Sequence, residues 1–142
     1  MSSYAGRGID AKPQLLVVKG SFSSMGGAER DILRNLPHLL KLFSIKVATL
    51  DTVIELESLC KNLKIPLLKS KENWNIPTDP ISIIRDSSME SSLKSWKKVE
   101  GLNEAILDSD MIHLISGDGT LSLIELIPES IPTHLHLSLI HI

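Results

Sequence analysis

Short apolar runs alternate along the chain with longer segments that have helical periodicity. Runs typical of buried strands occupy 15–20, 44–50, 65–68, 110–116 and 131–137. Apolar residues spaced three or four apart predict helices at 28–43, 52–63, 91–107 and 120–127. This alternation predicts an α/β fold, a Rossmann-like doubly wound parallel sheet of about five strands. We expect helices on both faces and a sheet that is incomplete at its C-terminal end.

Local signals refine this outline. Thr52 and Glu55 have capping-box spacing, which predicts the start of the second helix. Pro37 falls inside the first helical stripe and is expected to kink it, because proline lacks the backbone donor. Cys60 and Trp96 occupy core positions of their helices and are predicted to be buried.

Length and composition indicate one globular domain. The chain has 142 residues, of which 42% are hydrophobic and 23% charged. We divide it into a flexible arm at 1–13, a Rossmann-like domain at 14–137 and a tail at 138–142. The final residues, LSLIHI, resemble the start of a translated sequencing adapter, so we expect the tail to be non-native and homology to end near Leu137. The alternative is a natural continuation of the last strand.

Charge and hydropathy narrow the range of partners. The formal net charge is −2 and no block of Lys or Arg occurs, so the chain has no electrostatic footprint for nucleic acid. No stretch reaches the roughly 18 apolar residues that would span a bilayer. The polar start lacks the apolar core of a secretory signal. We therefore expect a cytoplasmic protein that contacts a membrane only peripherally, if at all.

The segment SFSSMGGAERDI, at 21–32, joins the first strand to the first helix. Ligands of open parallel sheets bind beyond the carboxyl ends of the strands, which is where this loop lies. Gly26 and Gly27 leave room for a ligand, and the helix behind them offers N–H donors and partial positive charge. Ser23 and Ser24 add hydroxyl donors. The loop is therefore a candidate phosphate or anion site; the alternative is a glycine turn that binds nothing.

The glycine spacing excludes two common phosphate-binding motifs. The loop does not match G-x-x-x-x-G-K-[ST], because no Lys-Ser or Lys-Thr pair follows the glycines. It does not match G-x-G-x-x-G either, because Gly26 and Gly27 precede Ala-Glu-Arg. A simple nucleotide triphosphatase and a dinucleotide enzyme are therefore disfavoured.

A first strand followed by SSMGGAERDILRNLPHLLK resembles the start of family-4-like retaining glycosyltransferases, which have two Rossmann-like domains (GT-B). Such enzymes commonly carry a Gly-Gly-Ala-Glu-Arg loop after the first strand. DMIHLISGDGTLSLIELIPESIPTHL also resembles their fourth strand, the next helix and the fifth strand. The resemblance spans roughly 15–137. It implies an N-terminal, acceptor-side domain in which Gly26 and Gly27 approach the diphosphate of a nucleotide-sugar donor.

The resemblance also implies a reaction and its participants. A sugar would pass from the nucleotide-sugar to a sugar, lipid or other acceptor with retention of configuration, without metal or cofactor. The family's second, donor-binding domain is not within these residues, so we expect this fragment to be inactive alone. Many relatives carry His-x-His at the end of the fourth strand. His113 matches the first histidine and is our catalytic candidate, whereas Ile115 stands in place of the second.

Further candidates come from the same loops. Those expected to bind the donor diphosphate or the acceptor are Ser24, Gly26, Gly27, Arg30 and Asp118. Arg30 could equally be solvated, and Asp118 could instead cap the following helix. His134 and His136 would share one face of a strand, but no third ligand has a spacing typical of a metal site.

Two alternative functions remain open. The chain could be a stand-alone Rossmann-like module that binds a phosphorylated ligand or a protein without catalysis. It could also be another doubly wound enzyme, for which His113 with Asp118 is the best available pair of catalytic groups. Trp74, in a polar loop, is a candidate for stacking on a sugar.

Overall fold

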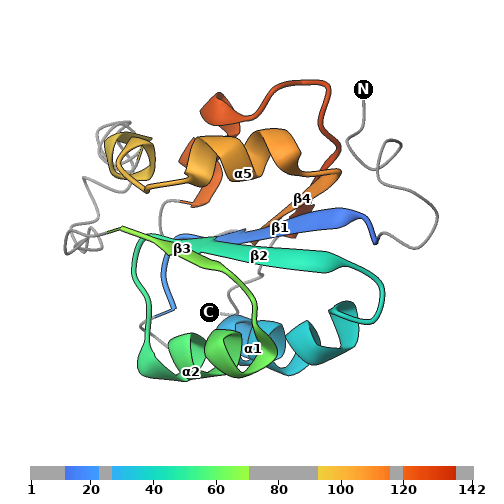
Figure 1. Cartoon of the computed structure of the whole chain (residues 1–142). Helices are drawn as coiled ribbons and strands as arrows, with labels where there is room; N and C mark the ends of the chain where they lie inside the picture. Colours follow the sequence, from blue (N-terminus) through green and yellow to red (C-terminus); the bar gives the residue numbers. More distant parts are fainter. Residues whose placement is uncertain (1–11, 23–26, 71–92, 116–119, 137–142) are drawn as a thin grey trace.

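A parallel sheet runs through the middle of the protein, with helices on both faces (Figure 1). The computed structural model describes residues 12–22, 27–70, 93–115 and 120–136. The sheet has five strands in the order β3-β2-β1-β4-β5. They are β1 (Gln14–Lys19), β2 (Ser44–Thr49), β3 (Leu67–Lys69), β4 (Met111–Ile115) and β5 (Thr133–His136). The predicted Rossmann-like α/β fold is confirmed.

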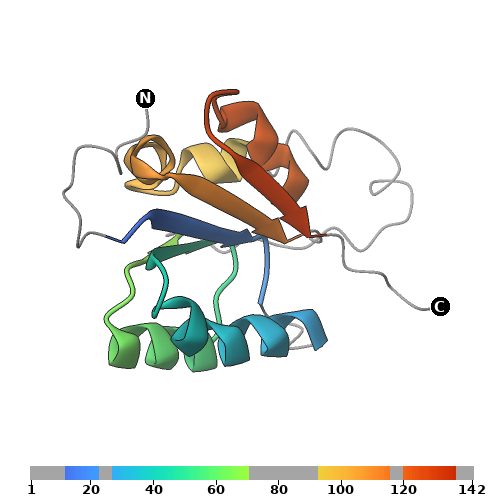
Figure 2. The same ribbon diagram turned by 90° about the vertical axis from the view of Figure 1, so that its right-hand side faces the viewer.

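The helices that follow β1 and β2 cover one face of the sheet, and those on either side of β4 in the sequence cover the other face. Helices α1 (Gly27–Leu39) and α2 (Ile54–Leu63) lie on one face, as the chain passes from β1 to β3. Helix α5 (Leu102–Asp108) and the 3₁₀ helix η2 (Thr120–Leu126) lie on the other face (Figure 2). The chain therefore adds β2 and β3 on one side of β1, and then returns to add β4 and β5 on the other side. In doubly wound sheets this switch point is where ligands bind.

Each face of the sheet has its own hydrophobic core. Leu16 and Val18 of β1 pack toward α5, whereas Leu15 and Val17 pack toward α1 and α2. This burial on both faces accounts for the continuous apolar run that marks β1 in the sequence. Cys60 and Trp96 are buried as predicted, in opposite cores.

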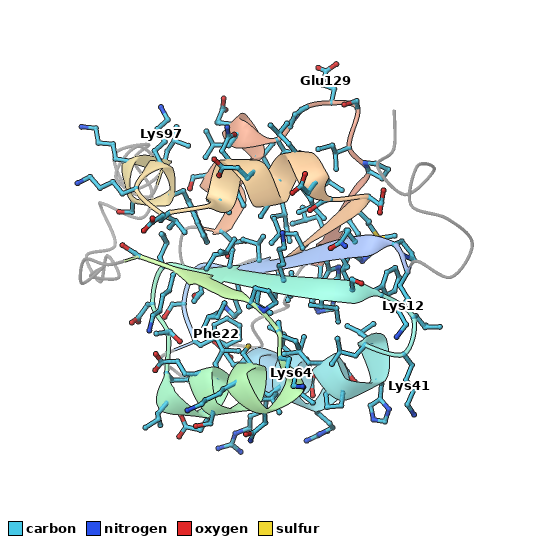
Figure 3. The ribbon with its side chains drawn as sticks, in the orientation of Figure 1. Lys12, Phe22, Lys41, Lys64, Lys97 and Glu129 are labelled. Carbon is cyan, nitrogen blue, oxygen red and sulfur yellow. The ribbon has the colours of Figure 1, made fainter. Side chains whose placement is uncertain are left out.

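Phe22 extends the core on the α1 side beyond the end of β1. Its side chain is completely buried and lies between the sheet and the two helices (Figure 3). The labelled charged residues of that figure lie at the surface instead: Lys12, Lys41, Lys64, Lys97 and Glu129. The chain that leaves β1 is therefore held by apolar packing before it reaches the glycines.

Two details of the predicted helices are wrong. The helix expected at 91–107 is broken: a short helix at 93–97 is separated from α5 by turns, and Gly101 adopts a positive φ of 81°. The capping box of Thr52 and Glu55 does not form. Val53 is the N-cap of α2 and makes no side-chain cap, while the Thr52 hydroxyl donates to the Val53 carbonyl.

Two other elements differ in extent or type. Strand β3 begins at Leu67 rather than Ile65, after Pro66, which has no N–H to donate to a strand ladder. The segment expected as a helix at 120–127 is the 3₁₀ helix η2. Pro37 lies in the last turn of α1, which ends at Leu39. Trp74, the candidate for stacking on a sugar, lies outside the described residues.

Candidate functional site at the carboxyl edge of the sheet

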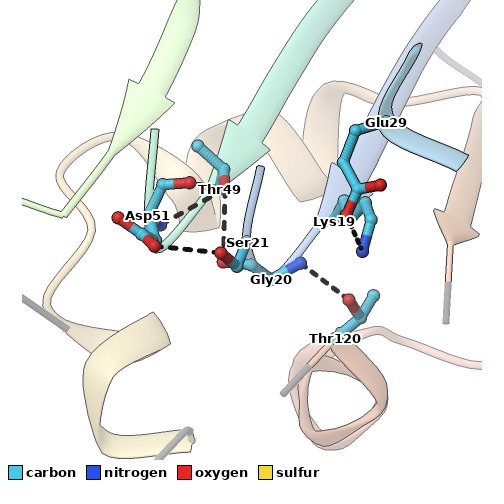
Figure 4. A network of polar contacts seen from close by, with 7 residues as sticks. All are labelled: Lys19, Gly20, Ser21, Glu29, Thr49, Asp51 and Thr120. Carbon is cyan, nitrogen blue, oxygen red and sulfur yellow. Dashed lines mark hydrogen bonds and ion pairs between the residues drawn. The ribbon is translucent and has the colours of Figure 1, made fainter. Parts of the chain in front are cut away.

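A polar network closes the carboxyl edge of β1 and β2 (Figure 4). The Ser21 hydroxyl donates to Asp51 Oδ2 at 2.9 Å, and the Thr49 hydroxyl donates to the Gly20 carbonyl at 3.2 Å. From η2, Thr120 Oγ1 accepts a hydrogen bond from the Gly20 amide at 2.7 Å. The exits of β1 and β2 and the start of η2 are thereby joined through short polar side chains.

Backbone hydrogen bonds reinforce the same edge. The Phe22 amide donates to the Asp51 carbonyl at 2.9 Å, and the Leu50 amide donates to the Gly20 carbonyl at 3.0 Å. Ser21 and Asp51 also form a parallel bridge beyond the ends of β1 and β2. The chain is therefore fixed up to Phe22, next to the glycine-containing segment that precedes α1.

An ion pair inside the protein joins the end of β1 to the start of α1. Lys19 Nζ lies 3.4 Å from Glu29 Oε1, and the two side chains are 4% and 6% exposed. Glu29 lies in the first turn of α1, where its negative charge also complements the helix dipole. Burying two charges is favourable only when they are paired and hydrogen-bonded, so this contact constrains how α1 sits on the sheet.

The structure places the predicted loop residues unevenly. Gly27 is the first residue of α1, and a Cβ added there would meet no atom within 4 Å. Arg30 is exposed in the first turns of the same helix, adjacent to the buried Glu29. Ser24, Gly26 and Asp118 lie outside the described residues. Gly27 and Arg30 are therefore the predicted binding residues that can be placed, and both lie at the start of α1.

His113 does not lie at this edge. It is the third residue of β4, half-buried on the face that carries α1, and it pairs in register with Val17. Its ring stacks on that of His134, with centroids 4.8 Å apart and planes 6° from parallel. Ile115, which occupies the second position of the family's histidine motif, is 3% exposed and packs in the core.

The ring environment of His113 affects its protonation. Partial burial lowers the pKa of His113, and the neighbouring charges of His134 and His136 lower it further. The neutral imidazole is therefore favoured in the folded protein, in a form that accepts or donates one proton. A cavity of about 220 Å³ between α1 and the β4–β5 edge is lined by His113 and His136, with Asp31 and Asn35.

Lys19, Asp51 and Thr120 were not identified from the sequence. Lys19 ends β1 directly after four apolar residues, and a charged residue that continues such a run is a signal that a buried partner exists. Asp51 follows β2, at the position where doubly wound folds often place an acidic residue. No comparable signal marks Thr120, whose role depends on the start of η2 lying next to Gly20 at the end of β1.

Metal-ligating clusters and membrane-spanning helices are both lacking among the described residues. Among them, no group of three or more His, Cys, Asp or Glu side chains could hold a metal ion. In the same part of the chain, no helix is long and apolar enough to cross a membrane. The site is therefore described by its hydrogen-bonding groups, the Lys19–Glu29 pair and the N-terminus of α1.

Comparison with known proteins gives a likeness of fold. No protein-family model and no curated protein matches the sequence. The chain is similar to the crystal structure of the C-terminal domain (residues 78–226) of a hydrogenase from Pyrococcus furiosus. The two have a TM-score of 0.59 and 14% sequence identity, over 92% of this chain and 95% of that domain. At this identity the likeness supports the Rossmann-like fold alone.

Proposed function

We propose that this chain is the N-terminal, acceptor-side domain of a family-4-like retaining glycosyltransferase. The main support for this proposal is the position of the Gly-Gly-Ala-Glu-Arg segment, which resembles the family. Gly27 begins α1 at the carboxyl edge of the sheet, and Glu29 of the same pentapeptide is bound to Lys19 inside the protein. The pentapeptide is thus built into the edge at which doubly wound folds bind their ligands.

The charges at the start of α1 suit a diphosphate. Glu29 is turned inward and its charge is balanced by Lys19, so it does not present a carboxylate to an incoming anion. Arg30 is exposed beside it, and the first turn of a helix presents backbone N–H groups and partial positive charge. A guanidinium with backbone donors is the chemistry that binds phosphate oxygens.

In the proposed reaction, this domain holds the acceptor and contributes to stabilising the nucleoside diphosphate as it leaves. Preorganised donors aimed at developing negative charge commonly supply a large part of catalysis. Transfer from the nucleotide-sugar requires a donor domain, which another part of the protein would supply. The catalytic role of His113 stays a prediction, because its ring lies in the middle of β4 and borders the cavity beside α1 rather than the carboxyl edge of the sheet.

A titration of the chain with uridine diphosphate tests the binding step. We expect the amide NMR signals of Gly27, Ala28 and Arg30 to shift during the titration, with a dissociation constant in the millimolar range or below. Arg30→Ala should raise this constant about tenfold. Arg34→Ala is the matched control, because Arg34 is exposed on the same helix but interacts with Asp31 at 3.8 Å. Shifts that do not involve α1, or equal weakening by both variants, would contradict the proposed site.

A second experiment tests the reaction itself. Sequencing the source gene beyond the codon for Leu137 should reveal an open frame that encodes a second Rossmann-like domain with paired glutamates. The whole product should then transfer sugar from a nucleotide-sugar, and Arg30→Ala should reduce kcat/KM. A frame that stops at codon 142 would reject the transferase assignment.

A stand-alone binding module is the second candidate. It is favoured by the hydrophobic cores on the two faces of the sheet, both of which are formed by described residues of this one chain. Such a module would use the same edge to bind a phosphorylated ligand without chemistry. Binding of uridine diphosphate by a chain whose gene ends at codon 142 would support it over the transferase.

A further inference from the structure

Three imidazoles gather on one face of the sheet, at the β4–β5 edge. His113 stacks on His134 at 4.8 Å between ring centroids, and the ring of His136 lies 6.1 Å from that of His113 at 41°. Strand register explains the arrangement: His113 pairs with His134 and Ile115 pairs with His136, so all these side chains share a face. We refer to His113, His134 and His136 as the histidine cluster.

The cluster joins an exposed edge strand to the rest of the protein. Strand β5 is one of the two edge strands of the described sheet, and its four residues are all exposed. The face of β5 that carries the cluster borders the cavity beside α1, which has an apolar floor of residues such as Val17 and Leu36. Movement of β5 away from β4 would remove the wall that His136 contributes to this cavity.

The charged groups around the cluster would stabilise protonated imidazole rings only weakly. From α1, Asp31 lines the same cavity, but its side chain is 68% exposed and interacts with Arg34. From β1, Lys19 lies on the same face, two strands from His136, and is paired with Glu29 of α1. The other residues of β4, Met111–Ile115, are uncharged.

We propose that the histidine cluster is an acid-sensitive latch for β5. While the rings are neutral, His113 stacks on His134 and β5 stays on the sheet; in this closed state His136 forms one wall of the cavity beside α1. When the imidazoles take up protons, like charges lie about 5 to 6 Å apart and repel one another. The repulsion favours states in which β5 separates from β4. This inference does not depend on the proposed transferase function.

The protonation behaviour of His113 agrees with this geometry. Its pKa is lowered by partial burial first, and then by the charges of His134 and His136. A base with a lowered pKa binds a proton less well in the closed state than in an open one. Acid therefore shifts the population toward the open state, in the window that begins near the ordinary imidazole value of about 6.5 and extends below it.

Amide hydrogen exchange at pH 7.5 and pH 5.0 tests the latch in this chain. Protection factors, which correct for the intrinsic pH dependence of exchange, should fall about fivefold or more at the lower pH for His134 and His136, whose amides face β4 in the parallel ladder. Val17 and Val47, in the middle of the sheet, should change less and serve as internal references. A uniform change across all strands, or none in β5, would overturn the proposal.

Two variants separate charge from packing. His134→Phe keeps a ring that can stack on His113 but cannot be protonated, so β5 should keep its protection at pH 5.0. His134→Lys carries a permanent charge and should show low β5 protection already at pH 7.5. The control is His38→Gln, on the exposed last turn of α1, which should behave like the parent. Equal acid sensitivity in the parent and in His134→Phe would contradict the latch.

Discussion

Lys19 at the end of β1 and Glu29 in the first turn of α1 form a buried ion pair, with Nζ and Oε1 3.4 Å apart. The two residues flank the loop that contains Gly26 and Gly27. The pair therefore fixes both ends of the candidate binding loop relative to each other. It also explains why a glutamate follows the glycines: Glu29 complements both the helix dipole and the buried lysine.

Removing one partner of this pair should be strongly destabilising. Lys19→Met leaves Glu29 buried without its cation, and such losses typically cost about 3–5 kcal/mol. Urea denaturation should show this loss for Lys19→Met and for Glu29→Gln. The double variant Lys19→Met/Glu29→Leu should recover a large part of it, because no buried charge remains.

The exposed pair of Arg34 and Asp31 provides the control for that measurement. Its side chains are 74% and 68% exposed and 3.8 Å apart, so Arg34→Ala should change the free energy of unfolding by less than about 1 kcal/mol. If Lys19→Met cost no more than Arg34→Ala, the buried pair would not be a constraint on α1.

Two left-handed positions should respond to substitution in opposite directions. Gly101 has φ 81°, so Gly101→Ala should cost about 1–2 kcal/mol. The added Cβ would lie 3.6 Å from Leu68 Cδ2, an ordinary contact, so the cost arises from the backbone. Lys64, the C-cap of α2, has φ 59° and carries a side chain in the same region. Lys64→Gly should therefore stabilise the protein, by up to about 1 kcal/mol.

Thermal or urea unfolding of both variants measures this pair of effects. The control is Lys61→Gly, because Lys61 is exposed within the last turn of α2. Leu63→Gly would be unsuitable, because it also removes an apolar contact. Lys61→Gly should destabilise by about 1 kcal/mol, as glycine does inside helices. The same sign for Lys61→Gly and Lys64→Gly would argue against a backbone origin.

The sequence pattern predicts most of the sheet because each buried strand position selects an apolar residue at that same position. The strand at β1 is covered on both faces, so nearly every residue from Leu15 onward is apolar. The same logic fails for the helix expected at 91–107. Trp96, Leu102 and Ile106 all pack into one core, so the apolar spacing continues across the break at Gly101. Periodicity records which face is buried, and it does not record whether the helix is continuous.

The candidate site is less predictable because it depends on tertiary contacts. The glycine loop is visible in the sequence, but Lys19 and Glu29 lie ten positions apart and meet only because α1 folds back along β1. The stacking of His113 on His134 depends likewise on β4 and β5 being neighbours in a parallel register. The alternation of His134 and His136 could only predict that these two side chains share a face.

Acid should destabilise the protein through His113. Its pKa is lowered by burial and by the other two histidines, so the unfolded chain binds a proton more tightly than the folded one. The contribution of His113 to stability should therefore be constant above the unfolded value of about 6.5 and should fall as pH drops below it. Urea melts between pH 7.5 and pH 5.0 measure the effect. His113→Phe should flatten this dependence, whereas His38→Gln should not; equal slopes in all three proteins would contradict it.

Cys60 should be inert as a nucleophile and should matter for stability at alkaline pH. Its side chain is 2% exposed, and burial raises the pKa of the thiol from 9.0 to about 11. The thiolate reacts with disulfide reagents, so a shift of this size leaves roughly a hundredth of the usual thiolate near neutral pH. Native protein should therefore react with such a reagent at least about 100-fold more slowly than urea-unfolded protein.

The same shift fixes the sign of the pH dependence that Cys60 contributes. A raised folded pKa means that its stabilising contribution is complete below pH 9.0 and is lost as pH rises through about 11. Urea melts of the parent and of Cys60→Ala between pH 8 and pH 10 separate this contribution from that of the lysines, which both proteins share. Cys60→Ala should be less stable at pH 8, and its deficit should narrow as pH rises. A constant deficit, together with fast thiol reaction in the native protein, would show that Cys60 is accessible rather than part of the core between α2 and the sheet.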